Sequence, residues 1–202
     1  NLHPAGVDEA RKRSCNPIQY NKGNALKAAS EIAAMANART LTIETIKESL
    51  NKYGILYIEV PKLDKAPIDA FSTMADAHPV ITVTYRYNDM DKLVFDVLHE
   101  LCHIDRHLTK EQTAFISVDD GSYATDPREK EANEFARQTL IPDTVWGDIM
   151  KVGCKSLSPF KIVKTIAITA ESKGISPSIA VARYKHDTNW YNTSAYRSPK
   201  IS

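Results

Sequence analysis

The segment from Asp91 to His107 constrains the fold more than any other part of the chain. Apolar residues recur in it at helical spacing, at positions 93, 94, 97, 98, 101 and 104. This period predicts an amphipathic helix over residues 91–107, which begins beside two aspartates. An apolar stripe of this kind has to be buried, so the helix must pack against another layer of the protein.

Local signals divide the rest of the chain into short elements. Residues 1–23 are polar and interrupted by Pro and Gly, so we expect an irregular lead-in. Strong helix formers predict two N-terminal helices within residues 24–54, at 24–38 and 42–54. β-Branched and aromatic residues predict strands, at 54–60, 79–87 and, more briefly, 68–74.

The second half of the chain is predicted to be mostly helical. Residues 108–126 form a long connection, of a length that is often functional. Pro127, early acids and a closing Pro142 predict a helix over 127–141. Three short helices should follow, at 143–152, 159–173 and 177–187. With 202 residues, of which 43% are hydrophobic, we expect a single domain over 1–202 with its catalytic core in 54–187.

Charge and cysteine content restrict the function. Lys and Arg total 26 against 25 Asp and Glu, so the net charge of +1 gives no reason to expect binding to nucleic acid or to an anionic membrane. The three cysteines form no close pair, which favours a reducing compartment. No apolar run approaches the roughly 18 residues of a spanning helix, and the first residues lack the apolar centre of a signal peptide. We therefore expect a cytoplasmic protein.

Two histidines in the predicted helix have the spacing of metal ligands. His99 and His103 lie four residues apart in HELCH, which places both imidazoles on one helix face. Glu100 is rotated by about 100° from His99, so its carboxylate can reach water at the metal without being a ligand. This is the division of roles in HExxH hydrolases. The alternative is an amphipathic helix with partly exposed histidines, since two ligands do not complete a site.

The helix predicted over 127–141 offers a third ligand. Glu129 and Asn133 are four residues apart, so one can bind the metal while the other orients a histidine ligand. We prefer Glu129 as the ligand, with Glu131 as the second choice, and Asn133 as the partner of a ring nitrogen. The alternative for each acid is a solvated side chain at a helix start.

HELCH followed about 25 residues later by EKEANEFARQTLIP resembles the ImmA/IrrE group of zinc metallopeptidases. In outline the resemblance covers residues 45–187, through GILYIEV, PVITVTY and KGISPSIAVARY. It implies Zn²⁺ held by His99, His103 and Glu129, with Asn133 as the supporting amide and Glu100 as the general base. It also implies an α+β, zincin-like fold, in which a small β-sheet packs beside the HExxH helix and further helices follow.

The resemblance further implies a zinc-dependent endopeptidase that cleaves a regulatory protein, such as a helix-turn-helix repressor. In longer chains of this kind the domain is fused to a DNA-binding domain, as in HigA-like antitoxins, and the chain begins at Asn1, so we consider such a domain upstream. The competing interpretation is a non-hydrolytic metal-binding regulator of a toxin–antitoxin or stress-response system. It would act by binding a toxin or a repressor. Either way we expect a protein partner, with no nucleic acid or membrane bound directly by this domain.

Four other features allow two interpretations each. We expect Cys102 to be a small buried hydrophobe, the alternative being a redox-sensitive thiol near zinc. His107 continues the i, i+4 series of the two histidines as a further possible ligand, but we expect it to be exposed, because a tetrahedral site cannot easily use three stacked turns of one straight helix. Tyr123, in the long connection, is a candidate oxyanion stabiliser, although packing on the surface is favoured. KGISPSIAVARY should pack in the core, the alternative being the second half of a DNA-reading helix-turn-helix.

Overall fold

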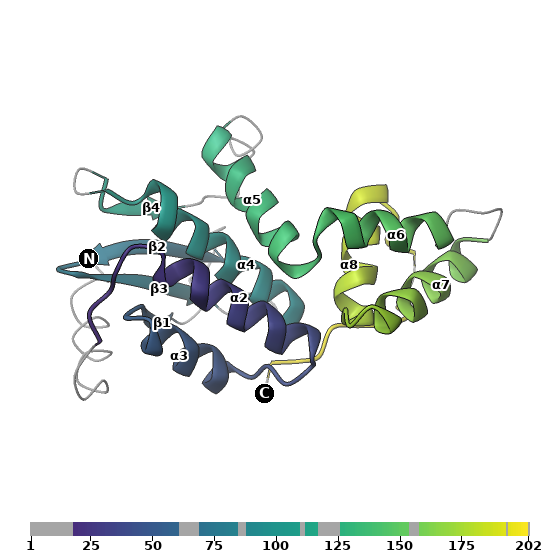
Figure 1. Cartoon of the computed structure of the whole chain (residues 1–202), viewed down its shortest axis with the longest axis horizontal. Helices are drawn as coiled ribbons and strands as arrows, with labels where there is room; N and C mark the ends of the chain where they lie inside the picture. Colours follow the sequence, from purple (N-terminus) through teal and green to yellow (C-terminus); the bar gives the residue numbers. More distant parts are fainter. Residues whose placement is uncertain are drawn as a thin grey trace.

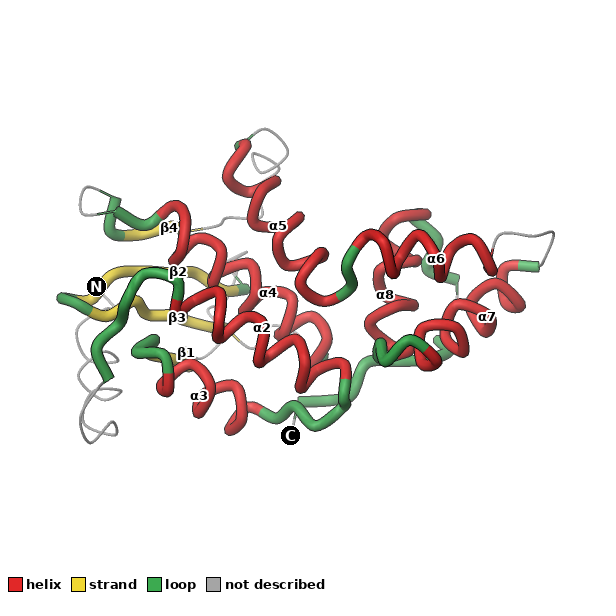
Figure 2. Tube along the Cα trace, viewed as in Figure 1, coloured by secondary structure: helices red, strands yellow, loops and turns green. Residues whose placement is uncertain are grey.

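The chain folds into a small β-sheet covered by helices, followed by a C-terminal group of helices (Figure 1). This computed structural model describes residues 18–60, 69–84, 88–109, 112–116, 126–153, 158–192 and 194–201. The described elements are α2 (Asn24–Asn37), α3 (Ile43–Lys52), β1 (Leu56–Val60), β2 (Ala70–Ala75), β3 (His78–Thr84), α4 (Met90–Cys102), the π-helical turn η1 (His103–His107), β4 (Ala114–Ile116), α5 (Pro127–Leu140), α6 (Asp143–Gly153), α7 (Pro159–Ser172) and α8 (Pro177–Thr188) (Figure 2). This is the α+β, zincin-like fold that the resemblance implies.

The four strands form one mixed sheet in the order β1-β3-β2-β4. β1 is parallel to β3, whereas β2 is antiparallel to both β3 and β4. The register places Tyr57, Ile81, Ser72 and Phe115 in one row across the sheet. Directly paired residues share a face of a sheet, and all four of these are buried. Phe115 stacks on the ring of His103, so this row lies on the side of the sheet that faces the two histidines.

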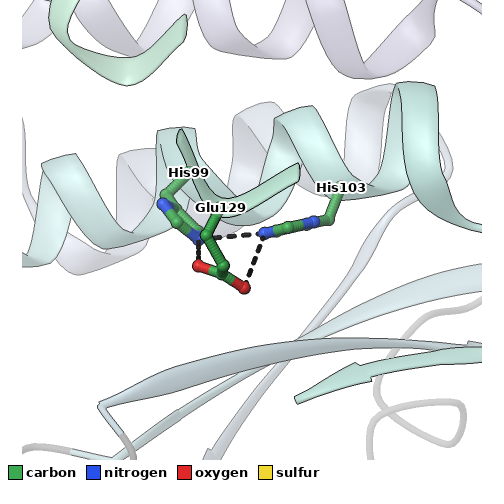
Figure 3. A group of neighbouring side chains, drawn as sticks. All are labelled: His99, His103 and Glu129. Atoms are coloured by element: carbon green, nitrogen blue, oxygen red, sulfur yellow. Dashed lines mark hydrogen bonds and ion pairs between the residues drawn. The ribbon is translucent and has the colours of Figure 1, made fainter. Parts of the chain in front are cut away.

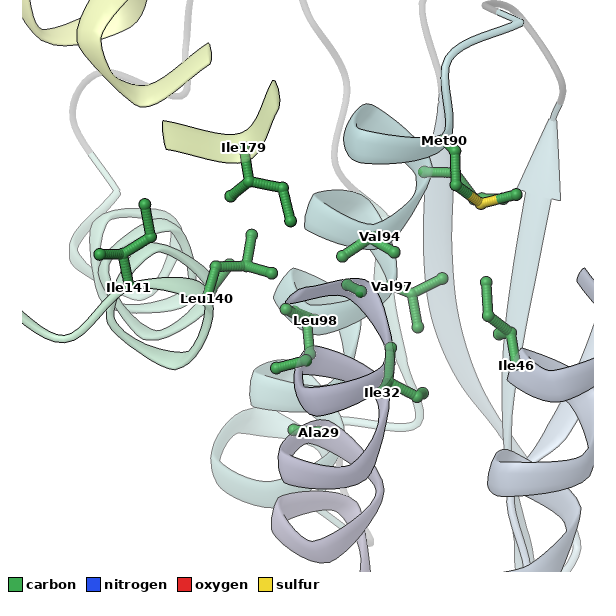
Figure 4. Close-up of a cluster of buried hydrophobic side chains, with 14 of the residues drawn as sticks. Ala29, Ile32, Ile46, Met90, Val94, Val97, Leu98, Leu140, Ile141 and Ile179 are labelled. Carbon is green, nitrogen blue, oxygen red and sulfur yellow. The ribbon is translucent and has the colours of Figure 1, made fainter. Parts of the chain in front are cut away.

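The α4 helix lies at the centre of the hydrophobic core. Its apolar residues pack against α2 and α5, and Figure 4 shows side chains of all three helices meeting. Ile32 from α2 and Leu98 from α4 are fully buried, and Leu140 from α5 is 5% exposed. Burying an aliphatic side chain of this size contributes roughly 1.5–3 kcal/mol. The shared core therefore determines how α5 lies relative to α4.

The start of α4 is capped from two parts of the chain. The side chain of Asp89 accepts a hydrogen bond from the backbone N–H of Lys92 at 2.9 Å. The carbonyl of Pro199 and the hydroxyl of Ser198 accept from the first two N–H groups of the helix, at 3.0 and 2.8 Å. Three of the four N–H groups that have no partner within the helix are thus satisfied. The C-terminal segment therefore helps to define where α4 begins.

The predicted elements are confirmed to within a few residues, with two differences. The helix expected over 91–107 is α-helical only as far as Cys102 and continues as the π-helical turn η1. Strand β4 lies inside the connection expected over 108–126, because its three residues are too few to give a strand signal. Most of the lead-in, residues 1–17, lies outside the described residues.

The C-terminal helices pack on one another and contribute to the same core. The segment KGISPSIAVARY buries Ile179, Ala180 and Val181, as expected for core packing. The buried Arg183 donates hydrogen bonds to the carbonyl of Ile141 and to Asp143, each at 2.6 Å. Arg183 therefore joins α8 to the start of α6.

Candidate metal centre

Three side chains from two separate segments meet beneath α4. His99 lies in the last turn of α4, His103 begins η1, and Glu129 lies in the first turn of α5. All three are buried, with His103 fully enclosed and the others less than 10% exposed. Figure 3 shows the two imidazoles and the carboxylate converging on one point between the helix and the sheet. Their nitrogen and oxygen atoms all lie within 4.8 Å of one another.

The distances between the donor atoms fit a tetrahedral metal ion. The Nε2 atoms of His99 and His103 are 2.9 Å apart, and Nε2 of His99 is 3.1 Å from Oε2 of Glu129. Nε2 of His103 is 3.7 Å from Oε1 of the same carboxylate. A tetrahedral zinc with bonds of about 2.0–2.1 Å separates its ligand atoms by roughly 3.3 Å, in the middle of these values. Two imidazoles with one carboxylate are also a ligand set of catalytic zinc sites.

Hydrogen bonds on the far sides of the rings orient the two imidazoles. Nδ1 of His99 donates to Oδ1 of Asn133 at 3.0 Å. Nδ1 of His103 lies 2.8 Å from Nδ1 of His107. When both Nδ1 atoms carry the proton, the two Nε2 atoms present lone pairs to each other. Lone pairs at this separation repel unless a cation lies between them, so the arrangement suits a metal ion.

Glu100 is buried beside this cluster without belonging to it. Only 2% of the residue is exposed, and its Oε2 atom has no hydrogen-bond partner among the described residues. Burial raises the pKa of Glu100 to about 7, against the lowering effects of the His99 charge and the Ser72 hydroxyl. A carboxyl group with this pKa can both take and give a proton at neutral pH.

The two histidines differ in their tendency to bind protons. Burial, together with the charges of His99 and His107, lowers the pKa of His103 to about 2. Burial alone would lower the pKa of His99 as well, but its hydrogen bond to Glu129 and the nearby carboxylate charges raise it overall. His103 is therefore neutral, which is the state that a metal ligand requires.

The remaining candidates lie away from the cluster. Glu131 is 46% exposed and forms an ion pair with Arg106 at 2.6 Å, so the structure does not bring it to the two Nε2 atoms. Cys102 is fully buried, and burial raises its pKa to about 12, as suits a small hydrophobe. Tyr123 lies outside the described residues.

One expectation is wrong: His107 is not exposed. Its side chain is only 7% accessible, because it contacts His103, Glu131 and the ring of Phe115. The expectation assumed a straight α-helix through residue 107, whereas a π-helical turn contains more residues and directs this side chain differently. The i, i+4 spacing from His103 was the signal that pointed to this contact.

Phe115 is a further residue at the site that no sequence motif identified. Its ring stacks on His103 with the centroids 3.8 Å apart and 19° between the planes, and the central guanidinium carbon of Arg128 lies 4.8 Å from the centroid of the Phe115 ring. The only sequence signal was the apolar triplet AFI inside a long polar connection. Phe115 thus closes one face of the His103 imidazole.

Comparison with known families agrees with this geometry. The profile of Peptidase_M78, described as the IrrE N-terminal-like domain, matches residues 43–159. This is more than half of the chain and includes all the residues of the cluster, although it ends earlier than the expected 45–187. No curated protein matches the chain. The chain therefore belongs to the Peptidase_M78 family of IrrE N-terminal-like domains, and its domain is of the metallopeptidase type.

Proposed function

We propose that this protein is a zinc-dependent endopeptidase in which His99, His103 and Glu129 hold the metal and Glu100 is the general base. The observation that carries the proposal is the buried carboxylate of Glu100, close enough to His99 and Glu129 to interact with the charges of both. A purely structural metal site needs no such group, because burying an ionisable side chain destabilises the fold.

The chemistry follows from the position and protonation of Glu100. When bound, the zinc ion acidifies water and polarises a peptide carbonyl. Glu100 takes the proton from the attacking water and then gives it to the departing amine. Asn133 holds the ring of His99 in the tautomer whose Nε2 atom faces the metal. The burial of the cluster strengthens each of these interactions, since the local dielectric constant is low.

For the substrate we propose a regulatory protein, such as a helix-turn-helix repressor, cleaved in the cytoplasm. The support is the match to the IrrE N-terminal-like domain and the resemblance of the two motif segments to the ImmA/IrrE group. Among the described residues, no helix has the length and apolar character needed to span a bilayer.

The test combines metal analysis with cleavage of a defined peptide mixture. Wild type, Glu100→Gln and Glu48→Gln are purified, loaded with Zn²⁺ and analysed for bound zinc. Each is then incubated with a proteome-derived peptide library, and new peptide ends are identified by mass spectrometry. Glu48 is exposed on α3, so its variant controls for the loss of one carboxylate.

We expect about one zinc per chain in all three proteins, as for a three-residue catalytic site. Wild type and Glu48→Gln should cleave the same peptides, and Glu100→Gln should cleave none. Normal cleavage by Glu100→Gln would refute the role of Glu100. Zinc binding without any cleavage by wild type would favour the non-hydrolytic regulator instead.

A further inference from the structure

We propose that His107 is a positioning residue for His103, which it holds through a hydrogen-bonded chain that ends on Glu131 and Arg106. The inference rests on the proposed metal site, because it assigns a role toward the ligand atom of His103. It concerns the end of the π-helical turn, on the side of His103 away from the other candidate ligands.

The chain of contacts runs outward from His103, one of the three candidate metal ligands. Nδ1 of His103 lies 2.8 Å from Nδ1 of His107, and Nε2 of His107 lies 3.3 Å from Oε2 of Glu131. The other carboxylate oxygen of Glu131 accepts a hydrogen bond from Arg106 at 2.6 Å. Four side chains from η1 and α5 are thus joined in one series.

Only one assignment of protons gives every link a donor and an acceptor while His103 remains a metal ligand. A free lone pair on Nε2 of His103 requires its proton to be on Nδ1, which then donates to Nδ1 of His107. His107 must accept there, so its own proton is on Nε2 and points to the carboxylate of Glu131. Glu131 accepts hydrogen bonds from both His107 and Arg106, so the series ends on a negatively charged carboxylate. That charge favours the tautomer of His107 with its proton on Nε2.

The His103 ring is also restrained from a second direction. Phe115 stacks on one face of the ring, and the ring is fully buried. Stacking opposes rotation about the Cβ–Cγ bond, which would turn the ring out of its plane, whereas a hydrogen bond at Nδ1 limits movement of the ring edge within that plane. Phe115 and His107 therefore remove different motions, and both are needed to aim Nε2.

The π-helical turn makes this contact possible. The N–H of Leu108 bonds to the carbonyl of His103 at 2.8 Å, which is the i to i+5 pattern of a π-helix. His107 is thereby placed against the outer edge of the His103 ring, with ring centroids 4.8 Å apart. It faces Nδ1 and not Nε2, so it supports the ligand without competing to be one. His99 has the equivalent support from Asn133 on α5.

A matched pair of substitutions tests the inference. His107→Asn keeps an acceptor two bonds from Cβ, in the place of Nδ1, whereas His107→Leu has a similar branched shape and no acceptor. Zinc affinity is measured for each by competition with a chromogenic chelator. Co²⁺-loaded proteins are compared by their visible absorption, which reports ligand geometry. Melting curves in excess chelator compare the stability of the metal-free folds.

We expect His107→Leu to weaken zinc binding by about 10- to 100-fold, the usual effect of losing a support of this kind, and to change the Co²⁺ spectrum. His107→Asn should stay within about threefold of wild type and keep its spectrum. Equal affinities of the Leu and Asn variants would overturn the inference. Absence of zinc binding by wild type would instead overturn the proposed function, so the two failures are distinguishable.

A second pair of variants tests the same inference if His107→Leu does not fold. Glu131 and Glu134 lie on α5 and their side chains are 46% and 44% exposed, but only Glu131 contacts His107. Glu131→Ala should weaken zinc binding by about two- to tenfold, a smaller effect because the residue is one step further from the ligand. Glu134→Ala removes the same charge and should have no such effect. Equal effects of the two variants would show that charge alone is responsible and would refute the hydrogen-bonded chain.

Discussion

Replacing Glu100 with Gln should stabilise the metal-free protein at high pH while it abolishes catalysis. Burial raises the pKa of Glu100 from 4.5 to about 7. The folded protein therefore binds the proton more tightly than the unfolded chain does. The stabilisation that comes from this tighter proton binding is complete below pH 4.5 and is lost as the pH rises to about 7. Above that pH, ionised Glu100 costs the fold about 3 kcal/mol relative to the protonated form.

The size of the effect can be isolated by comparing two pH values. Between pH 5 and pH 8, wild type should lose about 2.5 kcal/mol of unfolding free energy through Glu100 alone. Glu100→Gln cannot ionise, so the stability difference between variant and wild type should shift in favour of the variant by this amount. Any constant cost of burying the amide cancels in the comparison. For a chain of this length, the shift corresponds to roughly 5–10 °C in melting temperature.

The assay is urea unfolding in excess chelator, followed by circular dichroism at both pH values. Glu48→Gln, on the exposed side of α3, serves as the control and should show almost the same difference from wild type at pH 5 and pH 8. If the difference between Glu100→Gln and wild type is the same at both pH values, Glu100 does not ionise in a buried environment. Glu100 would then not be poised to exchange a proton near neutral pH.

Three further predictions follow from the contacts of the site and the core. Glu129→Gln should lose zinc in elemental analysis while Glu131→Gln keeps it, because only Glu129 lies within 3.1 Å of a ligand nitrogen; the reverse result would identify Glu131 as the third ligand. Asn133→Ala should weaken zinc binding by about 10- to 100-fold in a chelator competition, since it removes the acceptor of the His99 Nδ1 proton. An unchanged affinity would contradict its supporting role. Leu98→Ala should lower the free energy of unfolding by about 2–5 kcal/mol in urea titration, because the side chain is fully buried and leaves a cavity between α4 and its neighbours. A loss below about 1 kcal/mol would mean that the core does not hold α4 as described.

Much of the candidate site was predictable because its signals are local. The spacing of His99 and His103 determines that their rings share a helix face, whatever the rest of the fold does. The spacing of Glu129 and Asn133 has the same property, which is why a ligand and a supporting amide were expected on one helix. Local spacing does not distinguish Glu129 from Glu131, because both lie near the start of the same helix. Only the packing of α5 against α4 directs Glu129 inward and leaves Glu131 46% exposed.

The sequence by itself determined the periodic helix, the positions of the strands and the residues that are candidates for a metal site. These depend on side chains a few positions apart, so short-range spacing is sufficient. The tertiary structure decided the π-helical turn, the place of His107 and the stacking of Phe115, since each depends on contacts between segments that no local pattern encodes. It also decided that Glu100 has a raised pKa, because burial comes from the whole core that closes around α4.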